Sequence, residues 1–253
     1  MAAKRLKPVI RQIIAERYQS HATRLKVYDA LEKELGRPVV AFFTSFVYPV
    51  LISDDDADML EGVLRSMDLS KGLALVISSP GGSVLAAERI INACRGYSNK
   101  TENYWAIVPR KAKSAATMVC FGASKIIMSD TSELGPVDPQ TVKIVRNERK
   151  WLSVCNIIKS YENLFVEATR TTGNIQPYLL QLAYYDPREI EEFKASGELS
   201  EDIVVKSLKS GMMKGKSENG IKKNVQIFLT PERTKKHGRP IWKDEALACG
   251  LNI

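Results

Sequence analysis

The stretch from Leu73 to Gln140 constrains the fold more than any other part of this 253-residue chain. Three short apolar runs lie within it, each followed by turn residues: Leu73–Ser78, Trp105–Val108 and Lys125–Ser129. Short, continuous apolar runs that stop at turns are typical of buried strands in a parallel sheet. The sequence therefore predicts an α/β domain whose functional loops follow the carboxyl ends of these strands.

Composition narrows the classes of protein to consider. Hydrophobic residues make up 44% and charged residues 26%, which is ordinary for a globular domain. The formal charge of +8 is dispersed, without an aromatic-interleaved stripe, so we expect no nucleic-acid partner. The four cysteines are far apart and lack metal-binding spacing. With neither a signal peptide nor a membrane span in the sequence, we expect a cytoplasmic protein without a metal.

Three regions are expected along the chain: an N-terminal helical segment (1–38), an αβ domain (39–195) and a C-terminal extension (196–253). Helical periodicity covers residues 8–35, and Val39–Val47 has strand composition. Further on, the pattern predicts two helices, Trp151–Arg170 and Ile175–Ala183, with an interruption at Pro187. An exposed helix and a loop should follow within 198–220, and then a strand over Val225–Leu229.

A Pro-Gly-Gly turn follows the first apolar run, in the segment Ser79–Ser83. Proline cannot donate a backbone hydrogen bond, and two glycines permit positive φ and the close approach of a ligand. At a strand-to-helix junction, exposed N–H groups can point at a developing negative charge. We therefore interpret this segment as a candidate oxyanion-binding turn, with a plain tight turn as the alternative.

Ser114 is the candidate nucleophile. It follows a loop and precedes the small residues Ala115, Ala116 and Thr117 at the start of a helical pattern. The position suits an N-cap serine. It also suits a nucleophile, because the hydroxyl lies at the positive end of the helix and the Ala115 N–H can help to stabilise an oxyanion.

Few residues are suited to act as a base. Of the two histidines, His21 lies in a charged helical pattern, whereas His237 lies in a loop from which an imidazole could enter a site. Asp138 sits in a proline-flanked apolar loop, where a carboxylate needs a partner such as an imidazole. Lys159, in a helical pattern, offers a Ser–Lys alternative.

Several of these motifs resemble motifs of known protein families. The segment Ser79–Ser83 resembles the Ser-Pro-Gly-Gly turn of the Clp protease and signal-peptide-peptidase fold, and Ser114 falls where those families place their nucleophile. More closely, Leu134–Gln140 and the tail containing His237–Ile241 and Gly250–Leu251 resemble the serine dehydrogenase proteinase (SDH) family of Clp-fold serine proteases. The resemblance implies a Clp/crotonase-like αβ spiral of repeated β-β-α units, with added N- and C-terminal helical segments.

The SDH family is described as using a Ser-Asp-His triad. Matched residue by residue, the resemblance implies Ser114 as nucleophile, Asp138 as acid and His237 as base, with the Gly82 and Ala115 amides as oxyanion hole. The sequence departs from the family at Arg110–Lys113, where His-Tyr-Ala-Met or a similar segment is expected. It departs again at Ala115-Ala116, where a Gly-Gly pair is expected.

Several functions remain open on the sequence alone. The first is a serine peptidase acting on peptides or unfolded proteins through an acyl-enzyme, homo-oligomeric and without a cofactor. The second is a peptidase with a Ser114–Lys159 dyad. The third is a catalytically silent member that binds peptides or scaffolds an assembly, suggested by the departures around Ser114. A crotonase-like acyl-CoA enzyme is a less favoured fourth, and the fold alone does not separate these chemistries.

Overall fold

A computed structural model describes residues 21–48, 50–98, 104–145 and 147–253. Its centre is a four-stranded parallel sheet in the order β1-β2-β3-β5. The strands are β1 (Val39–Phe43), β2 (Leu73–Ser78), β3 (Tyr104–Val108) and β5 (Lys125–Met128). Leu75 stands in register with both Val40 and Ala106, and five of the six residues of β2 are buried. The α/β class predicted from the apolar runs is confirmed.

A second, smaller sheet carries the loops of the site. It joins the short strands β4 (Lys111–Ala112), β6 (Glu133–Leu134) and β9 (Ile241–Trp242). Strand β3 continues through β4 into helix α5 (Ala115–Gly122), so this part of the chain forms a strand-strand-helix unit. Because β9 pairs antiparallel with β6, the C-terminal segment is brought against the middle of the chain.

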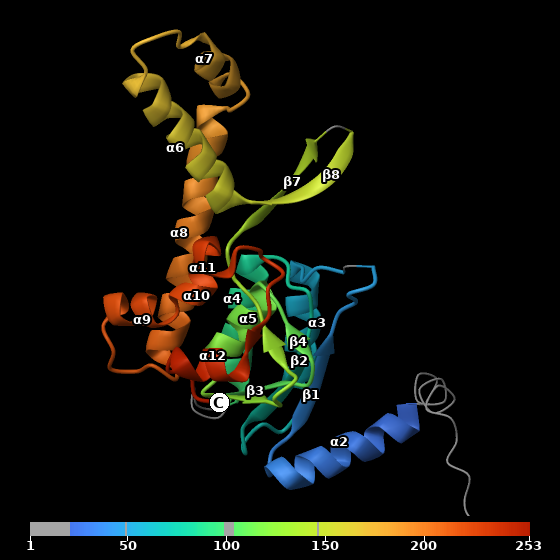
Figure 1. Ribbon diagram of the computed structural model, residues 1–253. Coiled ribbons are helices and arrows are strands. Elements are labelled where there is room, and N and C mark those ends of the chain that lie inside the picture. Colours follow the sequence, from blue (N-terminus) through green and yellow to red (C-terminus); the bar gives the residue numbers. More distant parts are fainter. Residues whose placement is uncertain (1–20, 49, 99–103, 146) are drawn as a thin grey trace, which may run out of the picture.

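Helices cover both faces of the large sheet (Figure 1). Helix α2 (His21–Leu35) places Tyr28, Leu31 and Leu35 against the Val39, Ala74 and Val76 side. The main core lies on the other face, with α3 (Asp54–Arg65), α4 (Val84–Tyr97) and α5.

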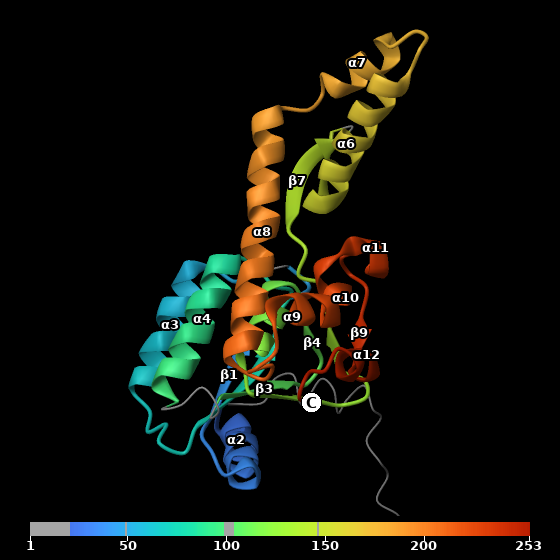
Figure 2. The ribbon, with the colours of Figure 1, turned by 90° about the vertical axis from the view of Figure 1, so that its left-hand side faces the viewer.

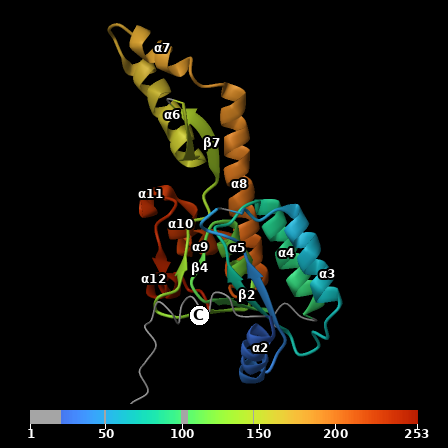
Figure 3. The same ribbon diagram turned by 90° about the vertical axis from the view of Figure 1, so that its right-hand side faces the viewer.

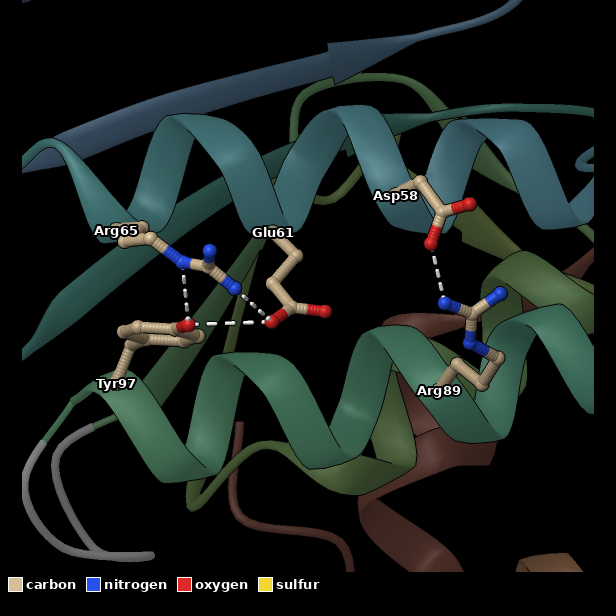
Figure 4. A network of polar contacts seen from close by, with 5 residues as sticks. All are labelled: Asp58, Glu61, Arg65, Arg89 and Tyr97. Atoms are coloured by element: carbon tan, nitrogen blue, oxygen red, sulfur yellow. Dashed lines mark hydrogen bonds and ion pairs between the residues drawn. The ribbon is translucent and has the colours of Figure 1, made fainter.

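Polar side chains link α3 and α4 along their exposed side (Figure 4). The hydroxyl of Tyr97 accepts from Arg65 Nε at 3.2 Å and donates to Glu61 Oε1 at 3.1 Å. Near the start of α3, Asp54 and Asp58 both pair with Arg89 of α4, and these bonds raise the pKa of Arg89. The pair of helices is thus fixed by apolar contacts inside and by hydrogen bonds outside.

An arm projects from this core (Figure 1). It consists of the hairpin β7 (Gln140–Val145) and β8 (Glu148–Ser153), helices α6 (Val154–Arg170) and α7 (Gln176–Leu182), and the first part of α8 (Pro187–Ser210). Side views show α8 running from the arm into the core (Figure 2, Figure 3). The lower part of α8 buries Ile203, Val204 and Leu208. In the described residues, no helix is long and apolar enough to cross a membrane.

The C-terminal part wraps around the core. After α8 come α9 (Glu218–Asn224), α10 (Gln226–Leu229), α11 (Pro231–Thr234) and, beyond β9, α12 (Lys243–Ala248). Phe228 of α10 is fully buried and packs edge-on against Phe121 of α5, with ring centroids 5.0 Å apart. The strand predicted for Val225–Leu229 is therefore wrong: a short apolar run fits a buried helical turn equally well.

Other boundaries also differ from the prediction. The first strand ends at Phe43 instead of Val47. The helix predicted from Trp151 begins at Val154, because Glu148–Ser153 pairs with Gln140–Val145 as a hairpin. Pro187 begins α8 instead of interrupting a helix, as proline does at a first helical position. This helix passes unbroken through residue 195 and is not exposed throughout. Of the helical pattern at 8–35, the part before residue 21 lies outside the described residues.

Candidate active site

A cavity of about 480 Å³ lies where the core meets the base of the arm. Core segments contribute Gly82, Ser114 and Val137 to its wall, the arm contributes Trp151, and the C-terminal loop contributes His237. Four segments predicted from the sequence to form the site, those around Gly82, Ser114, Val137 and His237, thus meet at one cavity. The wall is mostly apolar, with Leu51, Pro80 and Val84 opposite Trp151.

Ser114 holds an unusual backbone conformation between β4 and α5. Its φ is 50° and its ψ is −123°, a backbone conformation that residues other than glycine rarely adopt. No capping hydrogen bond is made by its hydroxyl, although Ser114 stands at the N-cap position. Ser114 lines the cavity from this strand-to-helix turn, the kind of position that the nucleophile occupies in α/β-hydrolases. The plain capping role considered from sequence does not describe this geometry.

The Pro-Gly-Gly turn lies directly against Ser114. Gly81 has φ +102°, and a Cβ built on it would lie 2.7 Å from Ser114 Cβ and 2.6 Å from the Lys113 carbonyl. A Cβ on Gly82 would lie 2.3 Å from backbone atoms of Ile52. Both glycines are therefore required by close backbone approach as well as by turn geometry. The sequence signal for this turn was its position after a buried strand.

Hydrogen bonds hold the turn from both sides. The Ile52 N–H donates to the Gly81 carbonyl, and the Ser83 N–H donates to the Ile52 carbonyl, each at 2.8 Å. The buried hydroxyl of Ser79 accepts from the Gly81 N–H at 3.1 Å and from Thr44 Oγ1 at 2.7 Å. Within the described residues, neither the Gly82 nor the Ala115 amide donates to a protein acceptor. Those two N–H groups are therefore not engaged within the described part of the chain, and Gly82 lines the cavity beside Ser114.

Asp138 and His237 are joined although 99 positions separate them. His237 Nδ1 lies 2.7 Å from Asp138 Oδ1. The aspartate side chain is fully buried and the imidazole is 16% exposed. The β6–β9 pairing brings the two loops together, and the Val137 N–H donates to the Phe228 carbonyl at 2.8 Å.

The histidine loop is held in place by Arg239. Its guanidinium donates to the Arg233 carbonyl at 3.1 Å and to Glu245 Oε1 at 3.2 Å. Its N–H also donates to the Lys236 carbonyl at 3.0 Å. The imidazole thus stands on a fixed loop, with Nδ1 on Asp138 and Nε2 left for the cavity.

Ser114 and His237 line one cavity, but no hydrogen bond between their side chains is found in the described part of the chain. Lys159 is placed differently. It lies within α6 on the arm, and it is not among the described residues lining the cavity with Ser114.

The two lysines before Ser114 bind groups of β6 and are not among the described residues that line the cavity. Lys113 Nζ donates to the Leu134 carbonyl at 2.9 Å and pairs with Glu133 at 3.3 Å. Burial lowers the pKa of Lys113. Lys111 pairs with the same carboxylate at 3.8 Å. The segment that differs from the family pattern before Ser114 thus contains two lysines that pair with one carboxylate, Glu133.

Sequence reasoning missed two residues that shape the site. The buried hydroxyl of Thr117 donates to the Ala112 carbonyl at 2.7 Å and accepts from the Gly135 N–H at 3.1 Å, tying the Asp138 loop to α5. Trp151, assigned from sequence to a helix, lines the cavity from β8. A threonine on the buried side of a helix of small residues could have indicated the role of Thr117. The position of Trp151 could not be inferred in this way, because it depends on the β7–β8 hairpin.

A family model described as ClpP-like SDH-type serine proteinase matches residues 3–158. The chain belongs to this family. The Clp-like α/β fold inferred from the resemblance is confirmed with it. The matched range includes the Pro-Gly-Gly turn, Ser114 and Asp138, whereas His237 lies beyond it.

Two uncharacterized proteins of Methanocaldococcus jannaschii are similar to this family member. One is 33% identical over 131 residues, which is 48% of this chain and 44% of the relative. The other is 29% identical over 126 residues, 46% of this chain and 42% of the relative. Each match therefore spans less than half the length of the curated relative.

Two solved structures of a protease align with part of this chain. Both are of the 1510-N membrane-bound stomatin-specific protease, one as a serine-to-alanine mutant and one as a lysine-to-alanine mutant in complex with a substrate peptide. The first covers 55% of this chain and 66% of its own at 17% identity and a TM-score of 0.35. The second covers 55% and 63% at 18% identity and a TM-score of 0.36. At these scores the family assignment depends on the family model.

Proposed function

We propose that this protein is a serine peptidase that hydrolyses peptide bonds through Ser114, His237 and Asp138. One observation carries the proposal. Ser114 is held at φ 50° beside a two-glycine turn, in the same cavity as a histidine bonded to a buried aspartate. A strained serine at a strand-to-helix turn, a base and an orienting carboxylate are the parts that acyl transfer requires.

The reaction follows from the positions of these groups. Ser114 Oγ attacks the scissile carbonyl carbon while His237 Nε2 takes the hydroxyl proton. The amides of Gly82 and Ala115 stabilise the oxyanion. His237 then gives the proton to the leaving amine, which departs and leaves an acyl-enzyme. A water, deprotonated by the same imidazole, releases the acid product and restores Ser114.

Asp138 has a positioning role in this scheme. Its Oδ1 fixes the tautomer that carries a proton on Nδ1, so that Nε2 is free to accept the proton from Ser114. Because the carboxylate is buried, its interaction with a protonated imidazole is little screened by solvent. The imidazolium that forms during attack is thereby stabilised.

The proposed substrate is a peptide or an unfolded protein segment. The apolar wall formed by Leu51, Val84 and Trp151 suits an apolar side chain beside the scissile bond. We further propose a cytoplasmic homo-oligomer assembled through the arm. Helix α7 has no buried residue, and of the residues of α6, all described, Val154 alone is buried. Such amphipathic helices are expected to pack against a partner surface.

Hydrolysis of short fluorogenic peptides with leucine before the reporter group tests the proposal. We expect turnover by the wild type, none by Ser114→Ala, and a loss of about 10³-fold or more in kcat for His237→Ala. Lys159→Ala should leave kcat unchanged. A loss in Lys159→Ala with His237→Ala unaffected would support the Ser–Lys dyad instead, and a folded wild type without turnover would support the silent, peptide-binding alternative.

A further inference from the structure

A second cleft lies on the far side of His237. It has a volume of about 680 Å³ and shares Gln140, Trp151 and His237 with the cavity that contains Ser114. Its other walls come from the start of α6 and from the loop at Lys235 and Lys236. Because they share these three lining residues, we treat the two neighbouring spaces as two halves of one longer cleft.

The two halves differ in chemistry. The half with Ser114 has no lysine, arginine, aspartate or glutamate among the described residues that line it. The second half carries hydroxyl, amide and ammonium groups, including those of Asn156, Tyr185 and Lys236. No aspartate or glutamate is found among the described residues that line it. Its carboxylate neighbour, Asp138, is already bound to His237. Among the described side chains, the lining of the second half thus carries positive charge and no carboxylate.

The two lysines of this cleft have no anionic partner in the described part of the chain. Elsewhere in that part, Lys143, Lys206 and Lys222 each pair with a carboxylate. Lys235 is held at φ 66°, a conformation rare for a lysine, and both lysines line the same cleft as His237. The amino-terminal end of the 17-residue helix α6 adds a positive dipole end on the opposite wall.

The direction of the peptide follows from the role of the histidine. His237 must protonate the leaving amine, so the amine side of the scissile bond passes over the imidazole. The second cleft contains His237 but neither Ser114 nor Gly82. It therefore lies on the side of the leaving group, whereas the apolar cavity lies on the side of the acyl group.

We propose that this cleft binds a carboxylate of the leaving segment through Lys235 and Lys236, and so selects peptides that are apolar before the scissile bond and acidic after it. This substrate preference rests on the proposed peptidase function. The carboxylate is supplied either by an aspartate or glutamate side chain or by a free C-terminus. Both sources present the same group to two ammonium ions.

Binding to the Ser114→Ala variant tests the preference without requiring turnover. The probes are fluorescent, C-terminally amidated peptides with one leucine, followed by glutamate at the first, second or third position, or by glutamine at the same positions. A fourth peptide has only alanine after the leucine and a free C-terminal carboxylate. We expect one glutamate position to bind about tenfold more tightly than its glutamine match. The free-acid peptide shows whether a C-terminus is accepted as well.

The double change Lys235→Gln with Lys236→Gln should abolish this difference between glutamate and glutamine peptides. The matched control is Lys214→Gln with Lys216→Gln, which removes the same charge from an exposed segment outside both clefts and should preserve the difference. Two results would overturn the inference: an acidic preference that survives in the Lys235/Lys236 variant, or a parent that binds neither a glutamate peptide nor the free-acid peptide more tightly than the glutamine peptides. Turnover of glutamine peptides by the wild type, measured in parallel, reports separately on the peptidase function.

Discussion

The core and the arm of this protein are built on different principles. Between Leu73 and Leu134 most side chains are buried, and helix α5 is buried along its whole length. In the arm, large apolar side chains such as Leu180 and Tyr184 stand 61% and 89% exposed. The core therefore fixes the geometry of Ser114 through its own packing. The arm supplies walls of the cleft and exposes apolar surface of the kind that binds a partner.

Glycine substitution gives the largest expected contrast between the two regions. In Gly81→Ala the new Cβ meets Ser114 Cβ and the Lys113 carbonyl, and the residue must keep a positive φ. We expect peptidase activity to vanish and the free energy of unfolding to fall by about 2–4 kcal/mol, measured by urea denaturation.

Gly173→Ala is the matched change in the arm, where the added Cβ meets nothing within 4 Å. We expect wild-type activity and a stability change within about 0.5 kcal/mol. Equal effects of the two substitutions would contradict the distinction between a tightly packed turn and an open arm.

Asp138→Asn tests the coupling of the C-terminal loop to the core. An asparagine can favour the tautomer with the proton on Nε2, so that His237 no longer accepts from Ser114. We expect kcat to fall by about 10²–10⁴-fold while KM changes little. A variant with wild-type kcat would show that the Asp138–His237 bond is structural only.

Truncation of leucines compares how the two parts of the molecule are packed. Leu208, on the core portion of α8, is fully buried, and Leu208→Ala should cost about 2–5 kcal/mol of stability. Leu180→Ala on α7 should cost less than about 0.5 kcal/mol in a monomer. If Leu180→Ala destabilises more at high than at low protein concentration, the arm is packed against another copy, as proposed.

Thiol reactivity gives the smallest but simplest contrast. Burial raises the pKa of Cys94 to about 12 and that of Cys249 to about 11, and it also raises the pKa of Cys120. Cys155, in the arm, is the partly exposed one of the four. Ellman titration of native protein should modify one thiol rapidly and the other three after unfolding. Rapid modification of all four would indicate that the core opens readily.

Local patterns in the sequence predicted the core well. The short apolar runs identified β2, β3 and β5, and the Pro-Gly-Gly turn and Ser114 lie at the strand ends where function was expected. Each of these features depends on residues that are near one another in the chain. Local periodicity and turn residues are therefore sufficient to predict their structure.

The arm and the C-terminal part were less predictable for a physical reason. The hairpin strands β7 and β8 contain several charged residues, so their alternation gave no clear strand signal. The pairing of β6 with β9 and the hydrogen bond from the Val137 N–H to the Phe228 carbonyl are long-range contacts, and they bring the His237 loop to Asp138. The wrong strand at Val225–Leu229 has the same origin, since burial of Phe228 against Phe121 is a tertiary contact. The resemblance at the tail pointed to His237 where periodicity could not.

Labelling with a fluorophosphonate probe, followed by mass spectrometry of the modified residue, tests the central claim most directly. We predict that folded wild-type protein is labelled at Ser114, that Ser114→Ala is not labelled, and that His237→Ala is labelled at a rate lower by at least about 10²-fold. Lys159→Ala should be labelled at the wild-type rate. Folded wild type that is not labelled, or His237→Ala that is labelled as fast as the wild type, would contradict an activated Ser114 that depends on His237.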